Sequence, residues 1–293
     1  MDKKINSYKS LTLNELERYS RHITLKEIGK HGQEKLKASS IICVGAGGIG
    51  SSLLMYLAAG GVGRIGIADN DYVDLSNLQR QVIHKDANIG RLKTISAKER
   101  IIEINPNCIV DIYNLRVSKD NILNLISSYD IVCDCTDNFP SRFLINDACV
   151  IQNKPYVYGS VQGFTGHISV FNLNDSSPNY RDLIPEAPPT ELAPDCSENG
   201  VIGVIPGIVG MIQATEIIKI ITNIGISLDG KLMVFNGLTM NFKTLNLLSH
   251  NKNRSITNLN DFADSYVEDS ISESSYEVIN IKPKDMKNLF NKN

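Results

Sequence analysis

The first half of the chain alternates short apolar runs with segments in which apolar residues recur every three or four positions. Strands are predicted at 41–44, 64–69, 109–114, 131–134 and 156–161, and the run 41–44 is continuous and apolar, as a strand buried on both faces should be. The helical period predicts helices at 13–36, with breaks at Gly29 and Gly32, and at 91–104, 121–126 and 140–152. Strands that alternate with helices predict a Rossmann-like, doubly wound, mainly parallel α/β sheet.

The second half has a different pattern. Runs at 167–171, 231–236 and 241–247 predict antiparallel strands that extend the sheet, around a long apolar helix at 204–222. Between them, 172–200 is rich in Pro, Ser, Asp and Glu, and so long a loop is usually functional or without fixed structure. We expect one domain over 1–248, a polar linker over 249–277 and a short tail over 278–293.

The composition is that of an ordinary globular protein and excludes some classes of function. Hydrophobic residues make up 42% of the 293 residues and charged residues 21%, with a net charge of −2. Without a basic surplus, nucleic acid is not the expected partner. We expect no membrane-spanning segment, which needs an apolar run of roughly 18–20 residues, and no secretory leader. We therefore expect a cytoplasmic protein, or a stromal one if it is plastid-encoded, with reduced thiols.

A glycine-rich turn follows the first predicted strand and opens a helix. Its glycines are Gly45, Gly47, Gly48 and Gly50. Glycines let a backbone turn tightly and approach phosphate, and a helix N-terminus offers unpaired N–H groups to an anion. The spacing fits a nucleotide fingerprint, although it fits NAD as well as ATP, and tight packing alone would also use glycines.

Asp69 ends the next predicted strand, about twenty residues after the glycines. A carboxylate in this position can accept hydrogen bonds from both ribose hydroxyls. The alternative is a turn-forming role, because Asp69-Asn70-Asp71 is also turn-like.

Two cations, Arg80 and Lys93, follow the ribose carboxylate. A triphosphate carries more charge than a dinucleotide, and it needs such side chains to stabilise it and the leaving pyrophosphate. The alternative is that both are solvated charges on a helix face.

Asp137 and Asn138 follow the strand that contains Cys133 and Cys135. Ligands bind at this rim in open α/β sheets, where a carboxylate beside phosphates is a natural Mg²⁺ ligand. One of the two residues can instead cap the following helix. The two cysteines alternate onto one face of the strand, which indicates core packing.

Cys196 lies alone in the acidic, Pro-containing loop. Core packing explains the other five cysteines, none of which forms a CxxC pair. A nucleophilic thiolate is one interpretation, although nearby Asp195 and Glu198 disfavour the thiolate by raising its pKa.

Several motifs occur together in one order: RYSRHI, GQEKL, GAGGIG, GVGRIGIADNDYVDLSNLQRQ, GRLK, INPN, CTDNFPSR and GSVQGFTGHISVF. From Leu13 to Leu247 the chain resembles the MoeB/ThiF/HesA family, relatives of the ubiquitin-activating enzymes, and most of all its molybdopterin-synthase adenylyltransferases. The resemblance implies a homodimer that uses ATP and Mg²⁺. Its partner would be a ubiquitin-like sulfur-carrier protein, resembling MoaD or ThiS, whose C-terminal Gly-Gly carboxylate is adenylated.

The resemblance also implies a role for each matched residue. Gly48 and its neighbours would contact the ATP phosphates, Asp69 the ribose and Lys93 phosphate. A second group would line the nucleotide pocket, with Asn77 and Arg80 on phosphate; its members are Ser76, Asn77, Leu78, Gln79 and Arg80.

Asp137 and Asn138 would hold Mg²⁺ and the nucleotide. Arg21 would reach the active site of the partner subunit. Cys196 matches a loop cysteine that in some members links covalently to the carrier during sulfur transfer.

The chain departs from the family pattern in two places. Members usually bind structural zinc through two CxxC pairs, but the first pair is replaced by Asn179-Tyr180-Arg181-Asp182 and the second is absent beyond Leu248. We therefore expect no zinc site and a looser segment there. Some relatives end in a rhodanese domain, and residues 278–293 weakly resemble the start of one.

The reaction we expect is attack of the carrier carboxylate on the α-phosphate of ATP, with release of pyrophosphate. Two other functions remain open: an NAD-dependent oxidoreductase, and a non-catalytic subunit that binds a carrier. The sequence does not choose among molybdopterin, thiamine and tRNA thiolation.

Overall fold

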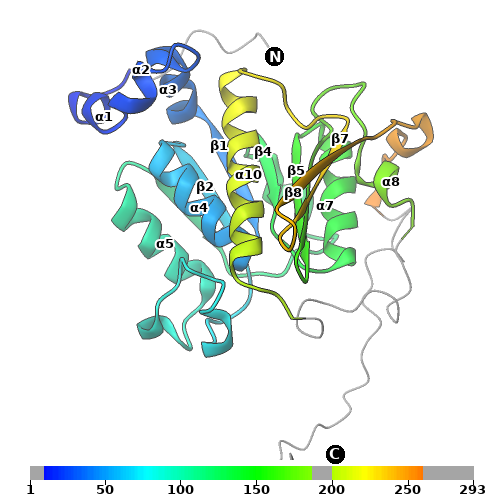
Figure 1. The fold of residues 1–293 in the computed structure, drawn as a ribbon, viewed down its shortest axis with the longest axis horizontal. Coiled ribbons are helices and arrows are strands. Elements are labelled where there is room, and N and C mark those ends of the chain that lie inside the picture. Colours follow the sequence, from blue (N-terminus) through cyan, green and yellow to red (C-terminus); the bar gives the residue numbers. More distant parts are fainter. Residues whose placement is uncertain (1–9, 187–199, 260–293) are drawn as a thin grey trace, which may run out of the picture.

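The computed structural model describes residues 10–186 and 200–259, which form a single sheet with helices on both of its faces (Figure 1). Its strands are β1 (Ser40–Val44), β2 (Arg64–Ala68), β3 (Ile109–Tyr113), β4 (Ile131–Asp134), β5 (Tyr156–Gln162), β6 (Thr165–Phe171), β7 (Lys231–Asn236) and β8 (Asn241–Asn246). Their order is β3-β2-β1-β4-β5-β6-β7-β8. The pairs from β3 to β5 are parallel and those from β5 to β8 antiparallel. The expected fold class is confirmed.

The helices occupy the segments between strands and the N-terminal region. They are α1 (Leu13–Arg18), α2 (Ser20–Thr24), α3 (Gly29–Ala38), α4 (Gly48–Gly60), α5 (Lys93–Ile104), α6 (Ile122–Ser127), α7 (Phe139–Gln152), α8 (Tyr180–Leu183) and α10 (Val204–Thr222), with short 3₁₀ turns η1 (Leu75–Asn77), η2 (Asp86–Asn88) and η4 (Asn251–Arg254).

Two apolar clusters, one on each face, hold the helices to the sheet. Successive side chains of a strand point to opposite faces. Ile41 and Cys43 of β1 therefore pack in the cluster that includes α4 and α10, whereas Ile42 and Val44 pack in the cluster with α6 and α7. Burial on both faces explains why Ile41–Val44 of β1 is a continuous apolar run.

One sequence expectation about helices is wrong. Gly32 does not break a helix: it lies inside α3, where an added Cβ would sit 3.0 Å from the Ile28 side chain. The chain breaks earlier, between α2 and α3, and Gly29 begins α3 with φ of 57°. The 19 residues of α10, with a mean hydropathy of 1.6 over 18 residues, are long and apolar enough to cross a membrane. In the fold α10 packs on α4 and the sheet, the position of a core helix.

Hydrogen bonds join residues 177–182 to residues 249–254, and we call this contact the clasp. Asp182 is its centre, because one carboxylate oxygen accepts from the His250 backbone N–H at 3.0 Å and from Asn253 Nδ2 at 2.8 Å. Asn179 Nδ2 donates to the Asn253 carbonyl oxygen at 2.7 Å, and Arg254 donates to the Ser177 carbonyl oxygen. The clasp joins the two places where the CxxC pairs of the family pattern are missing, residues 179–182 and the segment beyond Leu248. Hydrogen bonds thus join these two positions, and the expected looseness of the segment stays a prediction.

Candidate active site

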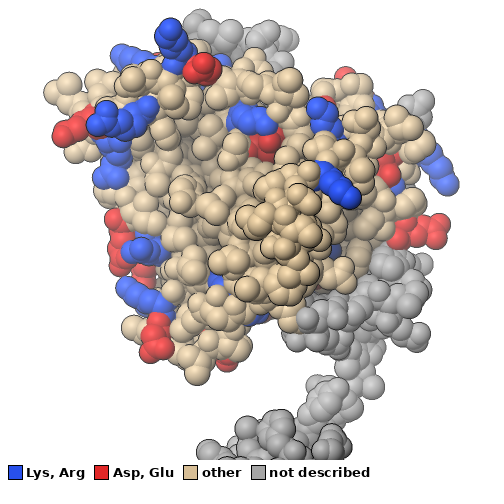
Figure 2. Space-filling model, viewed as in Figure 1, with Lys and Arg blue, Asp and Glu red and all other residues tan. Residues whose placement is uncertain are grey.

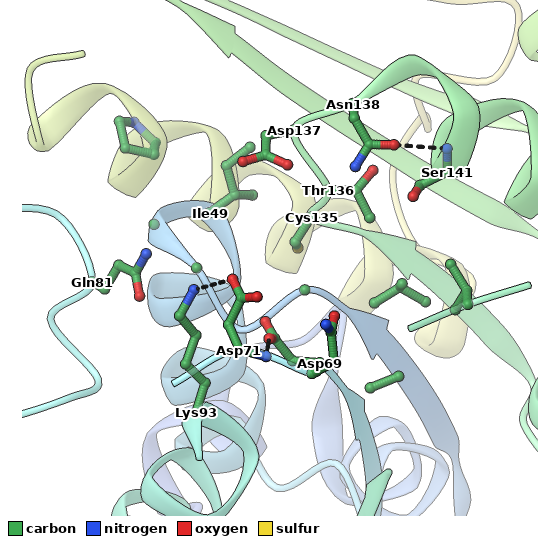
Figure 3. Close-up of a pocket in the computed structure, with 18 of the residues that line it drawn as sticks. Ile49, Asp69, Asp71, Gln81, Lys93, Cys135, Thr136, Asp137, Asn138 and Ser141 are labelled. Atoms are coloured by element: carbon green, nitrogen blue, oxygen red, sulfur yellow. Dashed lines mark hydrogen bonds and ion pairs between the residues drawn. The ribbon is translucent and has the colours of Figure 1, made fainter. Parts of the chain in front are cut away.

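A cavity of about 380 Å³ opens at the carboxyl ends of the parallel strands (Figure 3). It lies where β4 pairs with β1, while the strand order on the other side of β1 runs outward through β2 and β3. Ligands of open α/β sheets bind at this kind of topological switch. Its walls come from the glycine turn, the ends of β2, β3 and β4, and the start of α10.

The glycine turn forms the floor of the cavity. Gly45 has φ of 97°, and an added Cβ would lie 2.6 Å from the Cys135 carbonyl oxygen, so only glycine fits. Gly47 and Gly48 line the cavity at the N-terminus of α4. Gly50 does not line it, because it packs against the turn itself: an added Cβ would lie 2.3 Å from the Gly45 carbonyl oxygen. The turn can therefore present backbone N–H groups to an anion.

Asp69 lies beside the glycine turn and is tied to it. Its carboxylate accepts hydrogen bonds from the backbone N–H groups of Ala46, at 2.7 Å, and Asp71, at 2.8 Å. Burial raises the pKa of Asp69, while the positive charge of Lys93 opposes the shift. A carboxylate that is fixed and lines the cavity can accept hydrogen bonds from ribose hydroxyls.

Lys93 is the first residue of α5 and points into the cavity from the side of Asp69 (Figure 3). Its Nζ lies 2.8 Å from Asp71 Oδ2. Only 8% of the lysine side chain is exposed, against 60% of the Asp71 side chain. An exposed partner is easily displaced, so the ammonium group is available to an anion in the cavity.

Arg80 approaches from the segment after η1. It lines the cavity, and an added Cβ on Gly48 would lie 3.4 Å from its Cγ. Its Nη1 donates to the Ser76 carbonyl oxygen at 3.1 Å, which orients the guanidinium group. Arg80 and Lys93 thus bring two positive charges to the cavity, and a triphosphate could use both.

The opposite wall is the turn that follows β4. Asp134 is fully buried, and its carboxylate accepts from the Thr136 N–H and hydroxyl and from the Tyr156 hydroxyl, which fixes the turn. Asn138 caps α7 by accepting from the Ser141 N–H at 2.9 Å. Asp137 lies between them, exposed to the cavity. The structure therefore gives the capping role to Asn138 and leaves the Asp137 carboxylate facing the cavity (Figure 3).

Several predicted site residues do not line this cavity. Ser76 and Asn77 belong to η1, and Leu78 follows it. Gln79 packs on the start of α10, where an added Cβ on Gly203 would lie 2.1 Å from the Gln79 carbonyl oxygen. Cys196 lies outside the described residues. The roles assigned to these residues stay predictions.

Arg21 lies far from the cavity of its own chain. It is exposed on α2, whose His22 packs near Gly60, the last residue of α4. The cavity is at the other end of α4, and 13 helical residues span roughly 20 Å. A side chain on α2 therefore does not reach the cavity within one chain.

Two buried polar residues of the cavity are absent from the sequence predictions. Gln81 and Arg142 both line it, and each is more than nine-tenths buried. Gln81 Oε1 and Arg142 Nε have no hydrogen-bond partner in the described part of the chain. Arg142 Nη2 donates to the Thr136 carbonyl oxygen at 3.2 Å. The sequence signal that could have found them is the family resemblance, because Gln81 ends the motif GVGRIGIADNDYVDLSNLQRQ and Arg142 ends the motif CTDNFPSR.

Known proteins with similar sequences share one kind of name. The chain is 46% identical over 256 residues to a Mycobacterium tuberculosis protein named "Probable adenylyltransferase/sulfurtransferase MoeZ", which covers 86% of this chain and 65% of the relative. It is 47% identical to the "Probable molybdopterin-synthase adenylyltransferase" of Porphyra purpurea, covering 81% and 62%. It is 41% identical to the "Sulfur carrier protein adenylyltransferase" of Thermus thermophilus, covering 80% and 88%. The chain thus spans less than two thirds of the length of the first two relatives.

Solved structures share the fold. Escherichia coli MccB, crystallised with ATP, has a TM-score of 0.71 at 22% identity and covers 82% of this chain and 74% of MccB. At that identity the likeness establishes the fold only. The sequence profile of the ThiF family matches residues 19–256, which include the whole cavity. The match covers most of the chain, and the chain belongs to the ThiF family.

Proposed function

We propose that the chain is an ATP-dependent adenylyltransferase that activates the C-terminal Gly-Gly carboxylate of a ubiquitin-like sulfur-carrier protein. The observation that carries this proposal is the cavity. It combines a glycine turn, the Asp69 carboxylate, the cations Arg80 and Lys93, and the Asp137 carboxylate on the opposite wall. The names of the relatives supply the substrate class.

In the proposed reaction a carboxylate oxygen of the carrier attacks the α-phosphorus of ATP. The bond from that phosphorus to the bridging oxygen breaks, and acyl-adenylate and pyrophosphate form. The carboxylate is already ionised at neutral pH, so no general base is needed. Arg80 and Lys93 would stabilise the charge that develops on the leaving pyrophosphate, and Asp69 would fix the ribose. The protein thus acts by positioning and by charge.

The residues on the wall after β4 fit Mg²⁺. This ion is commonly held by one or two carboxylates together with substrate phosphates. Asp137 offers a carboxylate exposed to the cavity. The described residues contain no group of three or more His, Cys, Asp or Glu side chains suited to a metal without a substrate. Bound there, Mg²⁺ would neutralise phosphate charge.

The charges of the cavity weigh against the two alternative functions. An NAD-dependent oxidoreductase holds its pyrophosphate mainly on the glycine turn, and it has no need of two further cations beside it. A subunit that only binds a carrier does not need a nucleotide site. Here Asp69 and Lys93 lie on one wall of the cavity and Asp137 on the opposite wall.

The test is ATP–pyrophosphate exchange with purified carrier proteins that end in Gly-Gly. The proposal expects exchange that requires the carrier, ATP and Mg²⁺. Carriers of molybdopterin, thiamine and tRNA thiolation, assayed side by side, would identify the pathway. Absence of exchange with all of them, together with NAD binding, would overturn the proposal in favour of an oxidoreductase.

The proposal includes a homodimer in which Arg21 enters the cavity of the partner subunit. The face bearing α10 and α4 supports it, because Tyr56, Val204 and Met211 are exposed there. Figure 2 shows few charged side chains over the centre of this face. The distance between Arg21 and its own cavity supports it as well.

Mixing two inactive variants tests the shared site. Arg21→Ala and Asp137→Ala homodimers should both be nearly inactive. In a mixed dimer one site receives both changes and the other neither. Random exchange makes half the dimers mixed, each with one working site of two, so about a quarter of wild-type activity should return. A mixture that stays inactive despite demonstrated exchange would overturn the shared site.

A further inference from the structure

Gln213 is a fully buried amide in the middle of the apolar helix α10. Burying an amide is unfavourable unless its donors and acceptor find hydrogen-bond partners. Its hydrogen-bond partners therefore indicate its role, and they lie in the sheet, at the carboxyl end of β4 and in the adjacent β5.

The amide joins the last residue of β4 to the neighbouring strand β5. Gln213 Nε2 donates to the carbonyl oxygens of Asp134, at 2.8 Å, and Val157, at 3.1 Å. Asp134 is the last residue of β4, and Val157 belongs to the adjacent β5. The Cys135 thiol donates to Gln213 Oε1 at 3.7 Å. One side chain thus engages both strands and the first residue of the turn after β4.

The sheet has a matching gap for this side chain. Gly159 of β5 faces Gln213, and a Cβ there would lie 2.7 Å from the amide nitrogen. Any other residue at position 159 would push the amide away from the strands. Gln213 and Gly159 therefore form a matched pair across the interface of α10 and the sheet.

We propose that Gln213 is a positioning residue, whose amide fixes the carboxyl end of β4 against the neighbouring β5 so that the turn 135–138 presents Asp137 to the ATP phosphates. This inference rests on the proposed function. Asp134 supports it, because it carries both the carbonyl that Gln213 holds and the carboxylate that fixes Thr136. The cavity wall with Asp69 and Lys93 has no such contact with Gln213 among the described residues.

The test uses a graded series at position 213. Gln213→Met keeps the size and loses both donors, while Gln213→Glu can donate at most once, from its protonated form. The inference expects the exchange kcat to fall about 10–100-fold in Gln213→Met and less in Gln213→Glu. The Mg²⁺ concentration for half-maximal exchange should rise, and the Kd of ATP without Mg²⁺ should stay within about twofold.

Gln152→Met is the matched control. Gln152 Nε2 also donates to a backbone carbonyl, that of Leu123, at 2.7 Å, but at the end of α7 far from the cavity. If Gln213→Met behaved like this control, or lost ATP binding without Mg²⁺ as strongly as exchange, the positioning role would be wrong. Gln213→Glu decides the question if Gln213→Met does not fold.

A different result would count against the proposed function alone. If wild-type protein showed no exchange with any carrier, adenylation would fail. The inference would then be judged by Mg²⁺-dependent ATP binding: weakening of that binding in the position-213 variants would support it, and unchanged binding would overturn it.

Discussion

Two buried cations of this chain have opposite surroundings. Arg181 makes a two-point contact with Asp147, Nε to Oδ1 at 2.9 Å and Nη2 to Oδ2 at 2.6 Å, and their side chains are 5% and 0% exposed. Lys93 is almost as buried, but its partner Asp71 is 60% exposed. The first pair ties α8 to α7, next to the clasp. The second lines the cavity.

The difference distinguishes a charged side chain that stabilises the fold from one that can bind a ligand. When both members of a pair are buried, removing one leaves the other without compensation. When the partner is solvated, the pair contributes little to stability, and the buried member can exchange its partner for a ligand. The predictions below test this contrast, in order of decreasing effect.

Arg181→Met should cause the largest loss of stability. It leaves the Asp147 carboxylate buried without its cation, which typically costs about 3–5 kcal/mol of the free energy of unfolding. Urea denaturation measures this loss. A decrease below about 1 kcal/mol would mean that the pair is not the support of α8 that we describe.

Lys93→Met should show the reverse behaviour. Exchange activity should fall roughly 10²–10³-fold, because a preorganised charge at the phosphates is lost. The free energy of unfolding should fall by less than in Arg181→Met, because Asp71 is solvated and Asp69 keeps its two backbone N–H donors. Lys85→Met is the control: its pair with Glu103 is exposed on both sides, so activity and stability should both stay near wild type. Equal activity in the two variants would contradict the contrast.

Asp182→Ala tests the clasp. It removes the acceptor for the His250 N–H and for Asn253 Nδ2, and we expect a loss of about 1–3 kcal/mol on urea denaturation. Asp120→Ala, at an exposed site, should change little. Elemental analysis complements the experiment: about one zinc per purified chain would contradict a clasp that is held without metal.

His84 should make stability depend on pH. Its Nε2 lies 3.0 Å from the Ala46 carbonyl oxygen and its Nδ1 2.9 Å from Ser96 Oγ, behind the glycine turn. Burial lowers the pKa of His84 from 6.5, so the unfolded chain takes up the proton first as pH falls. The stability from neutral His84 is present above about pH 6.5 and is lost as pH falls towards the folded pKa.

The measurement is urea denaturation between pH 7.5 and 5.5. His84→Gln, which can keep a donor to Ala46, should lose less stability than wild type over this range. An identical pH dependence in the two proteins would show that His84 titrates normally.

Cys196→Ala should have the smallest effect. Adenylation uses phosphate chemistry alone, so carrier-dependent exchange should stay within about twofold of wild type. Loss of exchange in folded protein would place the thiol before adenylate formation.

The sequence predicted those parts of the molecule that depend on neighbours along the chain. Apolar runs located the strands, and the glycine turn with Asp69 located one wall of the cavity, because strand, turn and helix are consecutive there. Asp137 was predicted because it lies in the turn that follows a strand. The sequence missed Gln213, whose partners are 56 and 79 residues away and whose neighbours in α10 suggest only core packing.

The clasp was missed for a related reason. Asn179 and Asp182 are ordinary turn and capping residues in the sequence, and their second partners lie 74 and 68 residues further on. In the sequence, the absence of the cysteines predicted a loose segment. Local sequence patterns do not reveal hydrogen bonds between residues so far apart. The helix break predicted at Gly32 was wrong because this glycine lies inside α3 and packs closely against the Ile28 side chain. The general preference of glycine for helix ends does not reveal such packing.

The length of α4 sets the symmetry of any dimer with shared sites. The helix runs from the cavity at Gly48 to the neighbourhood of α2 at Gly60. If Arg21 of each chain serves the cavity of the other, the end of one α4 must face the beginning of the other. The two helices then run antiparallel about a two-fold axis perpendicular to both, and the sites are completed in pairs. In a closed ring of three chains, or in a filament, the Arg21 and the cavity of one chain would lie at different interfaces. The number of chains per oligomer in solution therefore tests whether the sites are completed in pairs.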